Sequence, residues 1–494
     1  MRLHDSEAGE KVRIEVCSNR FEPSLSLWSR ADPLSATAPS AFTRLDPVRE
    51  ESAPRTAPTR VPSGPGRTAT GAIRTLGSHP ATAPVVLHPG DAISTARRVV
   101  YIILLGALTA LGPFTIDLYL PAFPTLQADF RTSAAAIQLT LTGTMVGFAL
   151  GQLIVGPLSD KVGRRVPLLA VTALHVVASV AAALAPDLTL LAIARVFMGV
   201  GAAAGGVVAM AIVRDLFGGR RLVVMLSRLA LVSGAAPVVA PLIGSALLSV
   251  MPWRGIFVVL SVYGAVMLVA AIWLIPETLP AARRKERGAT TVLQRYRAVF
   301  SDRVFVGVLI IGGMSFSGLF SYLSSSSFLF QETYGFDAQQ YGLLFAANSL
   351  GLVVGVQVAA RLAARFGPQW VLSVSTGVLV VAAIAIIVCD QLGWGLWGTM
   401  VPLFVFMTAC GFTFPCVQVL ALDRHGKAAG TAASILGATN FGVAGLISPI
   451  VGWVARDAGI TATTMASVMV GCALIGAISL WAIVRPWTVE RLAP

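Results

Sequence analysis

Two charged side chains fall inside long apolar stretches and are the residues best suited to do chemistry. Asp117 lies in FTIDLYLPAFP and Arg195 lies in LAIARVFMGVGAAAGG. A charged group at mid-membrane costs about 3 kcal/mol on insertion scales, so such a group usually faces a partner or a water-filled cavity. A carboxylate held partly away from water can bind and release a proton, and a cation that moves nearby changes its proton affinity. We therefore interpret Asp117 as a proton carrier and Arg195 as its modulator.

Two other interpretations of these charges stay open. The two groups can form a static buried ion pair, or Asp117 can simply end its helix near the outer membrane surface, where YLP and FP begin. A shift of the sequence by 204 residues places Ser321 opposite Asp117 and Thr399 opposite Arg195. Both charges therefore belong to the first half of the chain only.

The stretch GQLIVGPLSDKVGRR, residues 151–165, ends an apolar run on one carboxylate and several cations. The 204-residue shift aligns it with GVQVAARLAARFGPQ, residues 355–369, where Ala364 replaces the acidic residue. Cations are favoured at the carboxyl end of a helix, and a carboxylate is favoured at the amino end of another. We expect a short charged turn where glycines let two helix ends approach, formed by Gly156, Asp160, Gly163, Arg164 and Arg165.

A proline-glycine run, SGAAPVVAPLIGSALL, interrupts a later apolar stretch. Proline removes a backbone donor and kinks a helix, and glycine allows helices to approach closely. The run predicts either a bendable helix at an interface or ordinary helix packing. Its key residues are Gly234, Pro237, Pro241 and Gly244.

Isolated polar side chains in the apolar stretches are weaker candidates for lining a substrate cavity. A cavity for a hydrophobic solute is mostly apolar and carries a few polar groups. The same side chains can instead hold helices together, and His175 is read as a packing residue. The candidates are Tyr119, Tyr322, Asn348, Gln418 and Asn440. None of the five cysteines forms a Cys-x-x-Cys motif, so no metal site is predicted.

The elements that carry these residues are long apolar segments. The chain has 494 residues, of which 55% are hydrophobic and 12% charged, and its mean hydropathy is +0.76. Each segment is close to the roughly 20 residues that cross a bilayer as a helix. This predicts an all-α polytopic membrane protein with spans at 99–121, 135–158, 166–185, 189–213, 223–250, 254–275, 304–328, 338–362, 370–389, 395–421, 428–454 and 460–484.

The twelve segments divide into two groups of six around a basic linker. We expect a first bundle at 96–276, a cytoplasmic linker at 277–303 and a second bundle at 304–494. Two related halves around a central pathway are typical of secondary transporters. Residues 1–95 are rich in Pro, Ser, Thr, Ala and Arg and are expected to be a disordered tail or a mis-annotated extension.

The Lys and Arg residues that give the net charge of +13 are distributed as expected for a protein that crosses a membrane many times. Cytoplasmic loops carry an excess of Lys and Arg. Most of the cations lie in the tail, the central linker and the loops on their side, whereas the other side has only Arg131, Arg254 and Arg456. Both termini are therefore predicted to be cytoplasmic in a multi-pass protein of the bacterial inner (plasma) membrane, and no nucleic-acid partner is indicated.

Several motifs resemble the major facilitator superfamily over about residues 97–485. GPLSDKVGRR is similar to the signature that follows its second helix, and Arg195 with Gly199 and Gly201 resembles its fourth-helix motif. GAAPVVAPLIG resembles the fifth-helix antiporter signature, with an alanine where glycine is usual before the proline. FTIDLYLPAFP, AIVRDLF and PLIGSALLSVMPWRGIF together resemble the Bcr/CflA branch of drug:proton antiporters, named for bicyclomycin and chloramphenicol resistance.

The resemblance implies the major facilitator fold, a gating role for the charged turn and a proton-transfer role for Arg195. We predict a proton-coupled exporter of small, largely hydrophobic drugs or antibiotics that works by alternating access. An exporter of a natural metabolite, such as an amino acid or a self-made antibiotic, is the alternative. No enzyme activity and no cofactor are expected, because the proton gradient supplies the energy. The expected partners are substrate, protons and the lipid bilayer, and the expected state is a monomer.

Overall fold

The computed structural model describes residues 90, 93–282, 284, 292–425, 429–455 and 459–489, with only the backbone at Ala204, Arg220 and 292–295. All of these belong to one compact unit, residues 82–494. The expected tail at 1–95 lies almost wholly outside the described residues, as does part of the expected linker at 277–303.

The first half of the described chain is built from long helices. They are α1 (Thr95–Asp117), the short η2 (Leu120–Ala122), α2 (Phe123–Phe130), α3 (Ala134–Val162), α4 (Arg165–Ala183), α5 (Leu188–Leu216), α6 (Gly219–Leu248) and α7 (Trp253–Leu274).

The second half follows the same plan. Its elements are α9 (Val292–Phe300), α10 (Arg303–Phe328), η3 (Leu329–Thr333), α11 (Ala338–Phe366), α12 (Pro368–Gln391), α13 (Gly395–Asp423), α14 (Ala429–Val454), α15 (Ala462–Ser479), η5 (Leu480–Val484) and η6 (Pro486–Thr488). Twelve stretches of the described residues are long and apolar enough to cross a membrane, which confirms the predicted all-α polytopic fold.

Capping side chains and glycine turns set the helix ends. Ser133, Asp187 and Asp337 each accept a hydrogen bond from a backbone N–H in the first turn of the next helix. Gly163 joins α3 to α4 with φ +113°, and Gly367 joins α11 to α12 with φ +90°. These conformations favour glycine. The 204-residue repeat predicted from the sequence therefore coincides with two equivalent turns.

The first membrane segment differs from its predicted boundaries of 99–121. The helix α1 already begins at Thr95 and ends at Asp117. The chain then continues through η2 and α2 as far as Phe130, with Pro121 and Pro124 at the starts of those two short helices. Proline has no backbone N–H to donate, so it fits the first turn of a new helix better than the interior of a continuous one.

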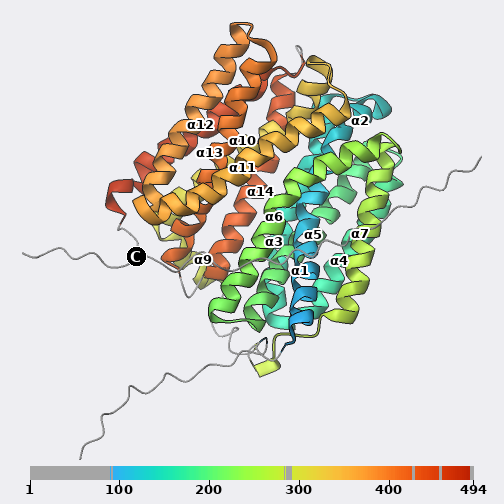
Figure 1. Ribbon diagram of the computed structural model, residues 1–494, viewed down its shortest axis with the longest axis vertical. Coiled ribbons are helices and arrows are strands. Elements are labelled where there is room, and N and C mark those ends of the chain that lie inside the picture. Colours follow the sequence, from blue (N-terminus) through green and yellow to red (C-terminus); the bar gives the residue numbers. More distant parts are fainter. Residues whose placement is uncertain are drawn as a thin grey trace, which may run out of the picture. The chain divides into compact units, whose positions relative to one another are not determined.

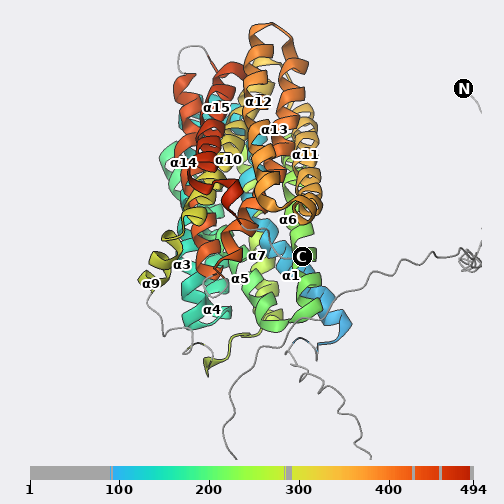
Figure 2. The ribbon, with the colours of Figure 1, turned by 90° about the vertical axis from the view of Figure 1, so that its left-hand side faces the viewer.

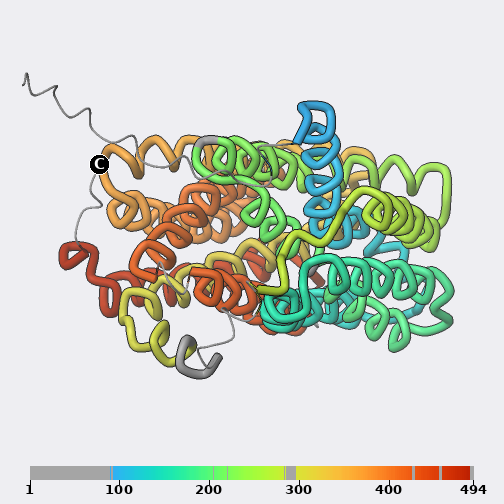
Figure 3. Tube along the Cα trace, turned by 90° about the horizontal axis from the view of Figure 1, so that it is seen from below, coloured from blue at the N-terminus to red at the C-terminus, as the bar shows by residue number. Residues whose placement is uncertain are grey.

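The two halves pack internally and meet along two helix pairs. In the ribbon, the helices coloured blue to green lie mostly on one side and those coloured yellow to red on the other (Figure 1, Figure 3). Between the halves, α3 packs on α14 and α6 packs on α11. In the first half, α5 packs against α1, α3 and α4, while in the second half α13 packs against α10, α11 and α12. Figure 2 shows α11, α12 and α13 side by side.

Polar contacts join the halves at one end of the bundle. We call the end where α1 begins the basic end, and the other the opposite end. At the opposite end, Gln138 of α3 donates to the Ser324 carbonyl at 3.2 Å and accepts from the Gly452 N–H at 3.1 Å. Nearby, the Gln331 side chain donates to the Pro121 carbonyl at 3.1 Å. These contacts close the halves on each other at the opposite end.

The crossing of α3 and α5 leaves no room for a side chain at Gly199, because a Cβ there would collide with the Thr144 carbonyl. Overpacking of this kind typically costs 1–3 kcal/mol or more. We expect Gly199→Val to lower both the yield of monodisperse protein and its thermal midpoint in detergent. Gly471 is the matched control, since a Cβ there meets nothing within 4 Å. Equal losses for Gly199→Val and Gly471→Val would contradict this account of the crossing.

Candidate functional site

Asp117 is buried at the end of α1, with 4% of its surface exposed. Its Oδ1 has no hydrogen-bond partner among the described residues. The carboxyl group lies within electrostatic range of Tyr322 in α10 and Tyr341 in α11, both from the second half. A buried acceptor without a partner is costly, so this oxygen is suited to receive a proton or a donor group from a substrate.

Arg195 of α5 is fully buried beside the same segment. Its Nη1 donates to the Thr115 carbonyl at 2.7 Å, and the guanidinium lies 4.4 Å from the centroid of the Tyr119 ring. Its Nε and Nη2 have no hydrogen-bond partner among the described residues. Cation–π contact with a desolvated ring is favourable, but two N–H groups remain available for another acceptor.

The two charged side chains do not form an ion pair with each other in this structure. Arg195 bonds to the carbonyl of Thr115, two residues before Asp117, and not to the Asp117 carboxyl group. Unpaired donors on one side and an unpaired acceptor on the other allow a second arrangement in which the guanidinium moves to the carboxylate. A fixed salt bridge, one of the alternatives left open by the sequence, is not the arrangement that this state adopts.

His175, which the sequence indicates only as a packing residue, is linked to Arg195 through Thr115. His175 of α4 is fully buried, with its Nε2 2.8 Å from the Thr115 hydroxyl and its Nδ1 3.2 Å from the Ser179 hydroxyl. The Thr115 hydroxyl also lies 2.6 Å from the Leu111 carbonyl, and that of Ser179 lies 2.7 Å from the His175 carbonyl. Thr115 therefore joins His175 to Arg195.

This network has one proton too few when the imidazole is neutral. Each hydroxyl has a single proton, and if it donates to its carbonyl, the ring nitrogen beside it must donate in turn. Both nitrogens of His175 donate only in the imidazolium form. In the neutral form, one of the four contacts around the His175 ring and its two hydroxyl neighbours therefore lacks a proton.

The second half supplies tyrosines and an amide to the site. Asn348 of α11 donates to the Tyr322 hydroxyl at 3.3 Å, and the Asn348 Oδ1 is buried without a partner among the described residues. The Tyr341 hydroxyl lies 2.8 Å from that of Ser326. Tyr119, Tyr322 and Tyr341 belong to one continuous buried cluster that spans both halves.

The other predicted cavity residues have different surroundings. Tyr119 is buried and its hydroxyl lies 2.8 Å from that of Thr140. Asn440 of α14 is half-buried, and its Oδ1 has no partner among the described residues. Gln418, in contrast, lies on the exposed side of α13. The structure therefore brings Tyr322 within electrostatic range of Asp117, Asn348 onto Tyr322, and Tyr119 onto Arg195. Gln418 has no such contact among the described residues.

The proline-glycine run lies in the part of α6 that touches both halves. A Cβ at Gly244 would collide with the Leu118 carbonyl, next to Asp117. On the other face, the space at Gly342 of α11 is filled by Ser245 and the Pro241 carbonyl. Pro237 and Gly234 are half-buried one and two turns nearer the basic end. This segment therefore contacts α1 and α11 at the level of the buried charges.

The charged turn at the basic end is organised by one buried arginine. Arg164 is 3% exposed, and its side chain contacts Asp215 of α5 at 2.8 Å, Asp160 at 2.7 Å and the Ser159 hydroxyl at 2.8 Å. Asp215 is buried, whereas the side chain of Asp160 is 41% exposed. Asp215 follows Arg214 in the motif AIVRDLF, and its position in the sequence alone does not predict its contact with Arg164.

Glu277 completes this turn from the chain that follows α7. Its carboxylate accepts hydrogen bonds from the N–H groups of Arg164 at 2.9 Å and Arg165 at 3.3 Å, where α4 begins. Partial burial acts to raise the pKa of Glu277, but the N–H groups of Arg164, Leu279 and Arg165, with the charge of Arg284, hold that pKa below its usual value. A carboxylate at a helix amino end is favoured by the helix dipole.

Comparisons with known proteins identify the family to which this fold belongs. A profile of the Major Facilitator Superfamily matches residues 103–449. YdgK of Bacillus subtilis, an MFS-type transporter, is 33% identical over 391 residues, which cover 79% of this chain and 96% of YdgK. The bicyclomycin resistance protein homologue of Haemophilus influenzae is 28% identical, over a match that covers 77% of this chain and 95% of that protein. The multidrug resistance protein MdtL of Citrobacter koseri is 27% identical, covering 75% and 92%.

Solved structures show the same fold at low sequence identity. A bacterial homologue of the human lysosomal transporter Spinster superposes with a TM-score of 0.62 at 15% identity, covering 81% of this chain and all of the homologue. Among the described residues, no group of three or more His, Cys, Asp or Glu side chains is placed to hold a metal ion.

The two carboxylates on Arg164 should differ sharply in their effect on stability. Removing one partner of a buried pair costs about 3–5 kcal/mol, whereas an exposed pair contributes about 0–1 kcal/mol. We expect Asp215→Ala to lower the thermal midpoint in detergent by many degrees and Asp160→Asn to leave it nearly unchanged, as followed by tryptophan fluorescence. A larger loss for the exposed Asp160 would contradict the central place given to Asp215.

His175 should influence transport through Thr115 and Arg195 more than it influences folding. His175→Phe removes both ring hydrogen bonds, while the Thr115 and Ser179 hydroxyls keep their carbonyl acceptors. A typical hydrogen bond contributes about 0.5–1.5 kcal/mol, which corresponds to up to roughly tenfold in rate. We expect His175→Phe to reduce efflux and shift its pH profile, and His175→Gln to restore part of it. Thr172→Val is the control, because Thr172 is buried on the same helix and bonds only to the Leu168 carbonyl. An unshifted pH profile in a well-folded His175→Phe protein would rule this out.

Proposed function

The chain belongs to the major facilitator superfamily, and from this premise we propose that it exports small, largely hydrophobic drugs or antibiotics in exchange for protons. The observation that carries the proposal is the buried Asp117 carboxyl group, whose Oδ1 has no partner while two N–H groups of Arg195 are also unpaired. A group in this environment changes its charge state only together with its surroundings. Proton binding at Asp117 and movement of Arg195 are therefore expected to be coupled.

The proposed cycle uses the two halves as rigid bundles, residues 96–276 and 304–494, joined by the linker 277–303. Asp117 comes from the first bundle, and Tyr322 and Tyr341 come from the second. A change in the charge of Asp117 alters its attraction to the second bundle, which is how a proton can bias the two halves toward one arrangement. The proline-glycine segment of α6 lies between α1 and α11 and is the proposed hinge.

The contacts at the opposite end supply the proposed outer gate. Gln138, Ser324 and Gly452 tie the halves together there, and they must separate before a substrate leaves on that side. By the positive-inside rule, the basic end is the proposed cytoplasmic side. The bacterial relatives make the inner membrane the proposed location. A membrane potential of about 100 mV then supplies roughly 2.3 kcal/mol for each charge moved.

The proposed substrate class rests on relatives whose names refer to drug resistance. Proteins named for bicyclomycin and multidrug resistance cover three quarters of this chain. The buried surroundings of Asp117 are aromatic. The amide oxygen of Asn348, whose side chain bonds to Tyr322, has no partner among the described residues. A site of this kind suits a compact, largely apolar molecule with one or two polar groups.

The decisive variant is Asp117→Asn, which keeps the shape of the side chain and removes the exchangeable proton. We expect cells that express it to lose protonophore-sensitive efflux of ethidium, chloramphenicol and bicyclomycin by at least about tenfold, a change equivalent to roughly 1.4 kcal/mol. Asp129→Asn is the matched control, because Asp129 is a half-exposed acidic residue near the opposite end that bonds to Trp253 and Arg254.

Retained proton-coupled efflux in Asp117→Asn would remove Asp117 from the role of proton carrier. Efflux in the wild type that ignores the protonophore would contradict proton coupling altogether. No efflux of any compound, from well-expressed protein, would favour a narrow metabolite exporter over a drug exporter.

The charged turn is proposed to act as a gate on the cytoplasmic side. Asp160 is half-exposed and bonds to Arg164, and it lies in the last turn of α3, the helix that packs on α14 of the second half. We expect Asp160→Asn to slow efflux several-fold at normal protein levels, with Asp187→Asn as a control carboxylate at the opposite end. Undiminished efflux in Asp160→Asn at equal expression would argue against the gate.

A further inference from the structure

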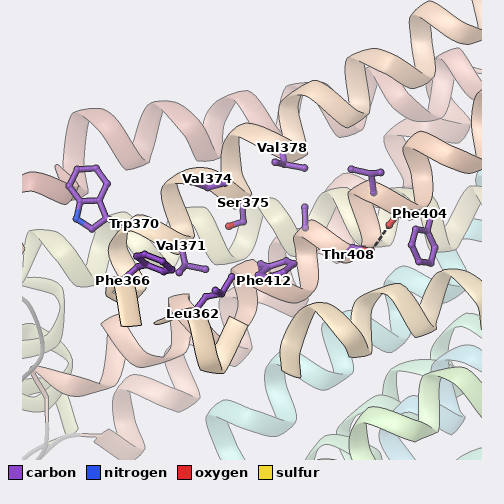
Figure 4. A pocket seen from close by; sticks show the side chains of 12 residues that line it. Leu362, Phe366, Trp370, Val371, Val374, Ser375, Val378, Phe404, Thr408 and Phe412 are labelled. Carbon is purple, nitrogen blue, oxygen red and sulfur yellow. Dashed lines mark hydrogen bonds between the residues drawn. The ribbon is translucent and has the colours of Figure 1, made fainter. Parts of the chain in front are cut away.

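A groove lies on the outer surface of the second half, well separated in sequence from the charged site. It has a volume of about 550 Å³ and runs along α13, with α11 on one side and α12 on the other (Figure 4). The walls α11 and α12 are joined by the tight turn at Gly367, so they come together at the basic end. Phe366 and Trp370 stand at that end, and Val378 and Phe404 lie further along (Figure 4).

The lining of the groove is apolar. The two hydroxyls in it are already satisfied: Ser375 donates to the Leu372 carbonyl and Thr408 donates to the Phe404 carbonyl. Several lining side chains are open to their surroundings, including Phe366 at 52%, Trp370 at 41% and Val374 at 68% exposed. All three helices are candidate membrane spans. The medium that meets these side chains is therefore lipid rather than water.

The groove has the length of a lipid chain. A second hollow of about 460 Å³ shares Val374, Val378 and Val405 with it and extends it to Ala385. The helical rise between Trp370 and Ala385 amounts to about 22 Å. One leaflet of the hydrocarbon core is roughly 15 Å thick. An acyl chain that enters from the membrane surface at Trp370 can therefore lie in the groove over the full depth of its leaflet.

Two cations stand beside the basic end of the groove. Arg361 and Arg365 are both exposed and lie one turn apart on α11, where they form no ion pair with any residue that the structure describes. The guanidinium of Arg365 lies 5.2 Å from the ring centroid of Phe366, which lines the groove. Arginine binds phosphate through paired N–H groups. The chemistry at this end suits an anionic phosphate-containing headgroup.

The first half of the chain lacks the same lining. The 204-residue shift places valines opposite all four aromatic residues of the groove: Val162 opposite Phe366, Val166 opposite Trp370, Val200 opposite Phe404 and Val208 opposite Phe412. The aromatic lining is thus particular to the second half and is not required by the shared fold.

From these observations we propose that the groove binds one anionic phospholipid, with an acyl chain along α13 and the headgroup phosphate at Arg361 and Arg365. The site is separate from Asp117, so the proposal goes beyond drug export and does not depend on it. A lipid held there fixes the spacing of α11 and α12 at the cytoplasmic surface, and α11 is the helix that packs on α6 across the interface of the halves.

The test is lipid binding to delipidated, purified full-length protein, measured by native mass spectrometry. Phosphatidylglycerol and phosphatidylcholine with the same acyl chains are titrated separately. We expect one phosphatidylglycerol to bind about tenfold more tightly than phosphatidylcholine, because each arginine near the surface favours an anionic lipid. The double variant Arg361→Gln, Arg365→Gln should bind the two lipids equally, whereas the control Arg228→Gln, another exposed cation near the basic end, should keep the preference.

A second variant tests the groove itself. Gly377 lines the second hollow, and a Cβ there meets nothing within 4 Å, so Gly377→Leu adds an apolar side chain to the lining with no clash at its Cβ. It should weaken binding of both lipids about tenfold, while Gly471→Leu, which has equally open surroundings on α15, should not. Equal binding of the two lipids by the wild type, or identical behaviour of Gly377→Leu and Gly471→Leu, would overturn the proposal. Normal lipid binding with lost ethidium efflux in Gly377→Leu would instead make the groove a substrate route.

Discussion

The fold has to accommodate a carboxylate and a guanidinium away from water, and neither is paired with the other. Charged groups in a membrane interior are costly unless partners or cavities compensate for them. Here Arg195 is held by the Thr115 carbonyl and the Tyr119 ring, while one oxygen of Asp117 has no partner among the described residues. The positions of α1, α4 and α5 are therefore tied to a polar network that is incomplete in this state.

The incomplete network around Asp117 lies near the second half, through Tyr322 and Tyr341. A second polar cluster, around Arg164 at the basic end, has all of its hydrogen bonds formed. Each side-chain nitrogen of Arg164 has a short contact, to Asp160, Asp215 or Ser159. Glu277 accepts hydrogen bonds from the backbone N–H groups of Arg164 and Arg165. All of these contacts lie within the first half and the chain that directly follows α7. In the proposed cycle, a change at Asp117 therefore moves the halves relative to each other rather than deforming one of them. The two helix pairs between the halves, α3 with α14 and α6 with α11, are where that motion is proposed to occur.

The number and approximate positions of the membrane helices could be predicted from the sequence, because hydropathy and loop charge follow directly from the cost of burying polar groups in lipid. The sequence also indicated Asp117, Arg195 and the charged turn as candidates, since a charge in an apolar run is visible without any structure. It did not identify the roles of His175, Asp215 and Glu277, whose partners are 60, 51 and 113 residues away in the chain. Nor did it separate Gln418 from Tyr322 and Asn348, because exposure depends on which face of a helix meets its neighbours.

The most direct test of the account is infrared difference spectroscopy of the purified protein as the pH is changed. A protonated carboxyl group in an apolar site has its own C=O band, which is distinct from that of an ionised carboxylate. The account predicts a band that titrates over the pH range in which efflux operates, responds to an added substrate such as ethidium, and is absent in Asp117→Asn. A spectrum without such a band, or one that Asp117→Asn leaves unchanged, would contradict the claim that Asp117 carries the proton.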